Sequence, residues 1–118
     1  MTLPDAGDLV VADFPGVSGP KRRPAVVLSS SVYHANHRDI VLGLITTQIS
    51  AASGPTDHIL YDWRAANLRR ASAFRAFIVT VPPATISARV RRLTDRDWAA
   101  ISDCVRRVFS ELHPANTP

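Results

Sequence analysis

The sequence predicts a mainly β fold, a small barrel or strongly bent sheet with a C-terminal α-helix. Short apolar and β-branched runs recur before residue 94, and Gly- and Pro-rich stretches separate them, as is typical of strands joined by turns. Residues 94–112 instead place apolar side chains at spacings of three and four, the pattern of an amphipathic helix. The 118 residues suffice for one domain with a core of its own, and no internal repeat or linker divides them.

The strands are expected in the first two thirds of the chain, at residues 8–14, 24–30, 40–48, 58–61 and 72–81. Turn-forming residues predict loops at 15–20 and 50–55. The dipeptide Pro82-Pro83 ends the last of these strands, because proline cannot donate to a strand ladder. Residues 86–93 fit either a short strand or a turn.

The C-terminal helix is predicted at residues 94–112. Thr94 and Asp97 have the spacing of a capping box, with Asp in place of the usual Glu. The apolar stripe of this helix is expected to face the core, and it consists of Trp98, Ile101, Val105, Val108, Phe109 and Leu112. Asp62 fits as the cap of a single helical turn at 63–66. Residues 113–118 are expected to form a frayed tail.

The formal net charge is +4, and thirteen of the fourteen basic residues are arginines, with Lys21 the exception. Arginine binds phosphate through a bidentate fork and stays charged when water is removed. A GC-rich genome also raises arginine content, but it does not explain why the arginines cluster at 69–75 and 89–92 while aspartates precede the first loop. The clusters predict a basic face and an anionic partner, above all a nucleic acid.

The sequence gives no sign of export or of a membrane. The first residues lack a basic region followed by an apolar stretch, and the apolar run from Ile40 to Ile45 is far shorter than a membrane span. The single Cys104 cannot form an internal disulfide and lies among apolar residues of the predicted helix. These features favour the cytoplasm and predict an inert thiol.

The most informative segment is the N-terminal one. Gly7-Asp8 opens an apolar strand, a Gly/Pro loop follows, and Lys21-Arg22-Arg23-Pro24 leads into a second strand. Three cations at the exit of such a loop would suit an anion clamp. Two further segments stand out, Ile45-Thr46-Thr47-Gln48 and Leu68-Arg69-Arg70-Ala71-Ser72. In order and spacing, these motifs resemble the MazF/PemK toxins of type II toxin–antitoxin systems, over about residues 7–110.

The resemblance implies an SH3-like (CcdB-like) β-barrel with a C-terminal helix. It also implies a metal-independent, sequence-selective endoribonuclease that cleaves single-stranded RNA, such as mRNA, through attack by the ribose 2′-hydroxyl. The implied protein is a homodimer without a cofactor, inhibited by a cognate acidic antitoxin. Toxins of the same fold that act on DNA gyrase, and a catalytically inactive RNA-binding barrel, remain alternative interpretations.

Arg23 matches the catalytic arginine of the family, immediately before the proline, and Pro24 restricts it to extended conformations. Thr46 matches the first threonine of the family's Ile-Thr-x-Gln stretch, and strand alternation places it on the face of Ile40, Leu42 and Leu44. A bulge near Gly43 would exchange the faces of Thr46 and Thr47. The residues expected to bind RNA are Lys21, Arg22, Thr47, Gln48, Arg69, Arg70 and Arg75.

The proton carrier is not identified by the sequence. One branch of the family has Arg-x-Asp on the strand that here reads Arg75-Ala76-Phe77, so the carboxylate of that branch is replaced by Phe77. His34 and His37 have no acidic or Cys partner nearby in the sequence, so metal binding is not expected there. Tyr33 and Trp63 could stack on unpaired bases, although packing explains them equally well.

Overall fold

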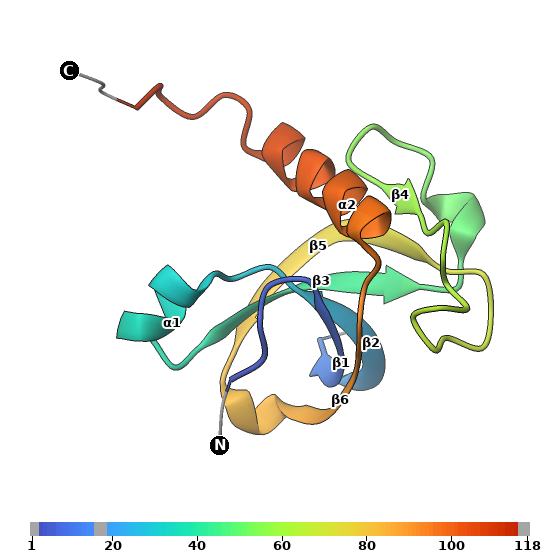
Figure 1. Ribbon diagram of the computed structural model, residues 1–118, viewed down its shortest axis with the longest axis horizontal. Helices are drawn as coiled ribbons and strands as arrows, with labels where there is room; N and C mark the ends of the chain where they lie inside the picture. Colours follow the sequence, from blue (N-terminus) through green and yellow to red (C-terminus); the bar gives the residue numbers. More distant parts are fainter. Residues whose placement is uncertain (1–2, 16–18, 116–118) are drawn as a thin grey trace.

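The computed structural model describes residues 3–15 and 19–115. Six antiparallel strands form one sheet in the order β4-β5-β3-β2-β1-β6, and α2 lies across one of its faces (Figure 1). The strands are β1 (Asp8–Phe14), β2 (Lys21–Val27), β3 (Ile40–Thr46), β4 (His58–Ile59), β5 (Ala73–Val81) and β6 (Ile86–Arg92). The helices are α1 (Ser31–Asn36) and α2 (Asp95–Val108), with single 3₁₀ turns η1 (Ile49–Ala51) and η2 (Pro83–Thr85). The predicted mainly β fold with a C-terminal helix is confirmed, as an open, bent sheet with β4 and β6 at its edges.

The sheet bends strongly. The rings of Phe14 in β1 and Phe77 in β5 lie 6.0 Å apart, although β2 and β3 separate these two strands. Across a flat sheet three strand spacings amount to about 14 Å. The sheet therefore curls until β1 and β5 approach each other on one face, which is why the sequence pattern resembles that of a barrel.

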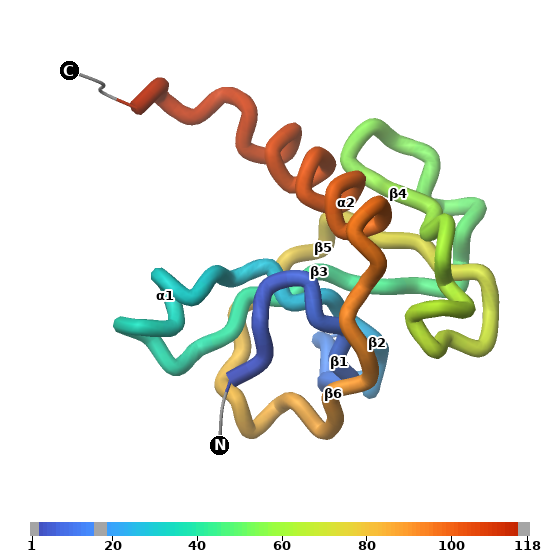
Figure 2. The backbone as a smooth tube through the Cα atoms, in the orientation of Figure 1, coloured from blue at the N-terminus to red at the C-terminus, as the bar shows by residue number. Residues whose placement is uncertain are grey.

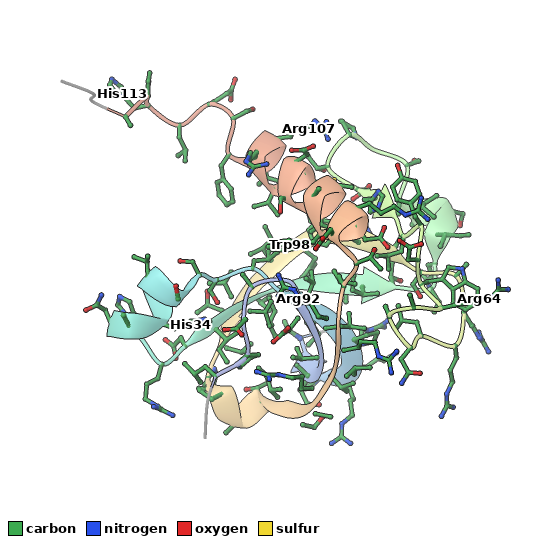
Figure 3. All side chains as sticks on the ribbon, viewed as in Figure 1. His34, Arg64, Arg92, Trp98, Arg107 and His113 are labelled. Atoms are coloured by element: carbon green, nitrogen blue, oxygen red, sulfur yellow. The ribbon has the colours of Figure 1, made fainter. Side chains whose placement is uncertain are left out.

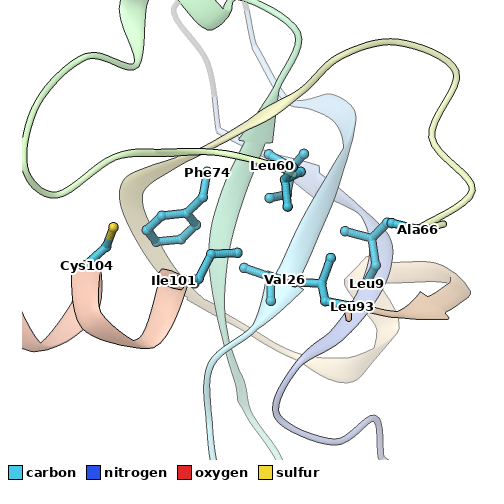
Figure 4. Close-up of a cluster of buried hydrophobic side chains, with 9 residues drawn as sticks. Leu9, Val26, Leu60, Ala66, Phe74, Leu93, Ile101 and Cys104 are labelled. Atoms are coloured by element: carbon cyan, nitrogen blue, oxygen red, sulfur yellow. The ribbon is translucent and has the colours of Figure 1, made fainter. Parts of the chain in front are cut away.

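Both faces of the sheet are buried, because α2 and the loops cover one face and the curl of the sheet covers the other. The helix-side core contains Leu9, Val26, Ile45, Leu60, Ala66, Phe74, Leu93, Ile101 and Cys104 (Figure 4). The far-side core contains Val10, Ala12, Phe14, Ala25, Val27, Ile40, Leu42 and Val81. Neighbours along one strand, such as Leu9 and Val10, alternate between the two cores, as the period of two requires. Burial raises the pKa of the Cys104 thiol, which suits a packing role.

Several boundaries differ from the sequence prediction. β2 begins at Lys21, three residues earlier than expected, and ends at Val27. The chain then turns into α1, which the sequence did not predict; the Ser30 hydroxyl caps it by accepting from the Tyr33 N–H. Residues 86–92 form a strand paired with β1. The predicted loop at 15–20 and tail at 113–118 lie partly outside the described residues.

Thr94 occupies the N-cap position of α2 as predicted, but the side-chain capping bonds expected of Thr94, Asp97 and Asp62 do not form. Thr94 precedes α2 but makes no capping hydrogen bond, since its hydroxyl donates to Asp62 Oδ2 at 2.7 Å. Asp97 is fully buried and accepts from backbone N–H groups of residues 61 and 62. Residues 63–66 form the predicted single turn, in which the Ala66 N–H donates to the Asp62 carbonyl oxygen at 3.1 Å, but the Asp62 carboxylate accepts from Arg96 in α2 instead of capping that turn. The acids at this end of α2 therefore join distant segments.

The apolar stripe of α2 is only partly core. Ile101 is fully buried, whereas Val108, Phe109 and Leu112 have exposed fractions of 40%, 49% and 71%. The helix ends at Val108 instead of continuing to Leu112. Figure 2 shows that the last turn of α2 and the segment after it extend beyond the sheet, and the described part of the chain covers these side chains only in part. The expectation that the whole stripe packs in the core is corrected accordingly.

Candidate active site

The strand pairing brings Arg23, Thr46 and Arg75 to one face of the sheet. Ala25 in β2 pairs with Leu44 in β3 as the last pair of their ladder, and alternation along each strand puts Arg23 and Thr46 on the same face as these two residues. On its other side Leu44 pairs with Arg75 in β5. Residues directly opposite each other in a sheet share a face. The three polar side chains thus lie on the face of the far-side core, at the end of β3.

A β-bulge near Gly43 leaves the faces unchanged. The pairing steps from Gly43–Ile78 to Leu44–Arg75, so β5 carries two extra residues, Ala76 and Phe77. An insertion of two preserves the alternation on both strands. Gly43 itself is required here because a Cβ would lie 2.4 Å from Cε1 of Phe74. Thr46 therefore keeps the face that the alternation predicts for it.

Thr46 is held in place by the turn that follows β3. Its side chain is buried, and Oγ1 accepts a hydrogen bond of 3.1 Å from the Gln48 N–H. This contact occupies an acceptor position of the hydroxyl and leaves its hydrogen available to a ligand. Thr47 and Gln48 are exposed and lie beyond the end of the strand. A buried hydroxyl with a fixed orientation, that of Thr46, is thus followed directly by the two exposed polar side chains of Thr47 and Gln48.

The three cations expected to form one clamp point to different faces. Arg23 is half-buried in β2, opposite Ala12, and Lys21 is exposed opposite Phe14. Arg22 alternates to the other face, where its Nε lies 3.9 Å from Asp13 Oδ1. Lys21 and Arg23 therefore share a face with Thr46, whereas Arg22 does not.

The loop that joins the edge strand β4 to β5 and the start of β5, together called the β4 edge, carry the second group of expected basic residues. Arg69 and Arg70 are exposed on the loop that enters β5, and Arg75 is exposed on the strand itself. The carbonyl oxygen of Arg70 accepts a 2.9 Å hydrogen bond from the buried Ser72 hydroxyl, which fixes this loop against the strand. Among the described residues none of these three side chains makes an ion pair.

The second arginine cluster, at β6, has a different role. Arg89 Nε lies 3.4 Å and Arg92 Nη1 3.7 Å from the carboxylate of the buried Asp8, which also accepts from the Asp5 N–H. Arg92 and Trp98 pack against Gly7, whose φ of +91° and close neighbours favour glycine. In Figure 3 Arg92 lies over the body of the molecule whereas Arg64 projects outward. Arg89 and Arg92 therefore share the carboxylate of Asp8, whereas Arg91 of this cluster is exposed and makes no ion pair among the described residues.

The sequence did not reveal the pair formed by His58 and Asp97. His58 Nε2 lies 2.8 Å from Asp97 Oδ1, with both side chains almost completely buried. His58 pairs with Phe74, so it lies on the helix-side face, opposite to Thr46. The pair is 39 residues apart in sequence, and the available signal, the capping-box spacing of Asp97, indicated a different role. His58 is thus on the wrong face to serve Arg23 and Thr46.

The remaining expected polar groups lie away from this face. His34 Nε2 lies 2.6 Å from the Ser29 hydroxyl, and the ring of His37 stacks on Tyr33. Within residues 3–15 and 19–115 no three His, Cys, Asp or Glu side chains gather as a metal site would require. None of the helices in that part of the chain is long and apolar enough to span a bilayer.

Comparison with known proteins identifies the family. Residues 5–109 match the model of the PemK-like, MazF-like toxins of type II toxin–antitoxin systems. Sequence comparison with curated proteins gives no significant match.

Solved structures with a similar fold include an endoribonuclease from Mycobacterial species in complex with its cognate antitoxin, at 16% identity and a TM-score of 0.75, covering 95% of this chain and 100% of that one. MazF from Deinococcus radiodurans is 22% identical with a TM-score of 0.72, covering 93% and 99%. The MazE-MazF structure from the same organism is 20% identical with a TM-score of 0.69, covering 92% and 97%.

Proposed function

Because the chain belongs to the PemK-like, MazF-like toxins of type II toxin–antitoxin systems, we propose that it is an endoribonuclease that cleaves single-stranded RNA without a metal ion. The observation that supports this proposal is that Arg23, Thr46 and Arg75 share one face of the sheet, near the last pair of the β2–β3 ladder. Two guanidinium groups and an oriented hydroxyl suit a phosphodiester group better than they suit an apolar ligand.

RNA supplies its own nucleophile, the 2′-hydroxyl next to the scissile phosphate. Arg23 stabilises the negative charge that develops on the phosphorane, because its fork can bind two oxygens at once. Thr46 donates its hydroxyl hydrogen to a phosphate oxygen, since Gln48 already occupies an acceptor position. Arg75 holds the adjacent phosphate. The very high pKa of arginine suits charge stabilisation and not proton transfer.

A second candidate function is RNA binding without cleavage. The observation that favours it is Phe77, which stands where one branch of the family keeps a carboxylate and lies beside Phe14. A face that binds phosphate but lacks a proton carrier would hold RNA and leave it intact.

The deciding experiment is incubation of the purified protein with a long RNA, with and without EDTA, followed by mapping of the cut ends. We expect cleavage in both conditions, with 2′,3′-cyclic phosphate or 3′-phosphate on one product and 5′-hydroxyl on the other. A 2′-deoxyribose on the 5′ side of a mapped site must stop cleavage there. Ends with 5′-phosphate would contradict the mechanism, and RNA binding without any cut would favour the second candidate.

We also propose that the protein forms a homodimer and that an acidic antitoxin inhibits it. Solved complexes of an endoribonuclease with its antitoxin and of MazE with MazF support the antitoxin, as does the net charge of +4. The exposed apolar residues at the end of α2, Val108, Phe109 and Leu112, suit a second copy of the chain. Sedimentation should give twice the mass of 12.9 kDa, and Phe109→Gln with Leu112→Gln should give the monomer. A monomeric wild-type protein under assay conditions would contradict the dimer.

A further inference from the structure

The N-terminal turn of α2 carries a polar network that the proposed reaction does not use. The fully buried carboxylate of Asp97 accepts hydrogen bonds of 2.8 Å from His58 Nε2 and the Tyr61 N–H, and of 2.9 Å from the Asp62 N–H. This carboxylate therefore fixes the backbone just after β4 to the start of α2. The residue in the middle of the network, Tyr61, is nevertheless 60% exposed.

The ring of Tyr61 is held by two neighbours. The guanidinium of Arg96 lies over it, 4.8 Å from the ring centroid, and the His58 ring meets it edge-on at 4.9 Å. Arg96 in turn is fixed by two hydrogen bonds to Asp62, of 2.6 and 2.7 Å. An exposed aromatic ring with a fixed orientation loses little freedom when a flat ligand stacks on it. Such preorganisation is characteristic of a recognition surface.

The segment of the chain that follows Tyr61 is aromatic and basic. Two residues further along, the Arg64 guanidinium lies 4.6 Å from the centroid of the Trp63 ring. Residues 60–75 contain four arginines, at 64, 69, 70 and 75, and one acid, Asp62, which is paired with Arg96. Aromatic rings among unpaired arginines form the surface that single-stranded nucleic acids use, with bases on the rings and phosphates on the cations.

We propose that Tyr61 is a stacking platform for an unpaired base of the RNA, beyond the phosphate held by Arg23 and Thr46. The inference rests on the proposed function for the identity of the substrate. Tyr61 lies two residues after the end of the edge strand β4, and Arg75 on the neighbouring strand shares a face with Thr46. β4 lies two strand spacings from β3, about 10 Å. The RNA passes from the Thr46 face over the β4 edge, along Arg69 and Arg70, to the ring.

Nucleic acid explains this surface better than an acidic peptide does. A peptide carboxylate would pair with the arginines, but it would not require a fixed, exposed tyrosine ring. A base stacks on the ring irrespective of its identity, and this contact is worth about 1–3 kcal/mol. The proposal therefore predicts a contribution that depends on the aromatic ring and not on charge.

The test compares Tyr61→Leu and Tyr61→Phe with the matched control Tyr33→Leu, which changes a tyrosine on α1 at the other end of the molecule (Figure 1). The Tyr33 ring already stacks on His37, so it is not expected to stack on a base. The probe is a single-stranded oligodeoxynucleotide that carries 2-aminopurine, which lacks the 2′-hydroxyl and so stays uncut. We expect Tyr61→Leu to weaken binding about 5- to 150-fold and to abolish the stacking-induced quenching of the probe. Tyr61→Phe and Tyr33→Leu should stay within about twofold of wild type.

Thermal unfolding of each variant separates folding from binding. Wild-type affinity in Tyr61→Leu, or an equal loss in Tyr61→Phe, would overturn the stacking platform even if the protein cleaves RNA as proposed. A Tyr61-dependent affinity in a protein that leaves RNA intact would support the platform while the endoribonuclease proposal fails. Loss of binding to an acidic peptide with unchanged oligonucleotide binding would overturn it in favour of a protein partner.

Discussion

The two edges of the sheet carry similar clusters of arginines, which differ in whether their side chains are paired with a carboxylate. At the β6 edge Arg89 and Arg92 lie against the buried Asp8. At the β4 edge Arg69 and Arg70 are exposed, and within the described residues no carboxylate pairs with them. The sequence presents both clusters as equally basic. The comparison teaches that a nearby buried carboxylate, and not the number of arginines in a cluster, decides which arginines are free for a ligand.

The physical reason lies in the cost of burying Asp8. A carboxylate that loses its water must be compensated by charge and hydrogen bonds, or the fold loses stability. The Asp5 N–H and the two guanidinium groups provide that compensation. At the β4 edge the acid nearest to the arginines in sequence, Asp62, is bound to Arg96 instead. The unpaired arginines there remain available to phosphates.

The largest expected effect contrasts a site arginine with a paired one. Arg23→Ala should lower the rate of RNA cleavage about 100- to 1000-fold, because it removes the cation that faces the phosphorane. Arg92→Gln removes the same charge at the β6 edge and should leave the rate within a few-fold of wild type. Initial rates on one RNA, with circular dichroism as the folding check, measure both. Comparable losses of rate in the two variants would mean that the overall positive charge of the protein, and not the position of Arg23, promotes cleavage.

The second prediction removes the carboxylate that pairs with the arginines at the β6 edge. Asp8→Asn keeps an acceptor for the Asp5 N–H but loses the attraction for Arg89 and Arg92, which should cost about 1–2 kcal/mol of unfolding free energy. The released guanidinium groups should also strengthen oligonucleotide binding at low salt.

Urea denaturation and salt-dependent binding measure these changes. Asp103→Asn is the matched control, since this exposed aspartate pairs with Arg106 on the surface of α2 and should change stability by less than about 0.5 kcal/mol. Equal unfolding free energies of the two variants would mean that the ion pairs of buried Asp8 contribute no more than a surface pair, and would not explain the difference between the two edges.

The third prediction concerns the hydroxyl of Thr46, which shares a face of the sheet with Arg23. Thr46→Ala should slow cleavage about tenfold, because a phosphate oxygen loses one hydrogen bond, and Thr46→Ser should retain most of the rate. Both variants lose the same γ-methyl group, so the contrast isolates the hydroxyl. Single-turnover rates measure it. Similar rates in the alanine and serine variants would assign Thr46 to packing.

What the sequence predicted depends on local rules. Arg23 before Pro24 and Thr46 at a strand end follow from backbone restriction and from alternation, and the two-residue bulge at Phe77 leaves that alternation intact. The partner of a charge is set by tertiary contacts. The sequence therefore did not predict that Arg89 pairs with Asp8 or that His58 pairs with Asp97, because the two residues of each pair are far apart in the sequence. Asp97 shows the limit most clearly, since its local spacing suited a cap that it does not form.

The smallest expected effect tests the exception at the β4 edge, the pair of Asp62 and Arg96. Hydrogen bonds from Arg96 and from Thr94 lower the pKa of Asp62 from 3.8 to about 2. A carboxyl with a lowered pKa in the folded state stabilises the fold above its unfolded pKa, and the contribution disappears as the pH falls through the folded value.

Wild type should therefore be more stable than Asp62→Asn by a constant amount above about pH 4, and this difference should shrink between pH 4 and pH 2. Urea midpoints of the two proteins from pH 6 to pH 2 measure the difference directly, since other titrating groups are common to both. The Arg96 guanidinium that Asp62 fixes also lies over Tyr61, so the quenching of a stacked 2-aminopurine should weaken over the same pH range. A stability difference that persists unchanged to pH 2 would mean that Asp62 is not held by Arg96 in solution, and that the β4 edge has no paired arginine after all.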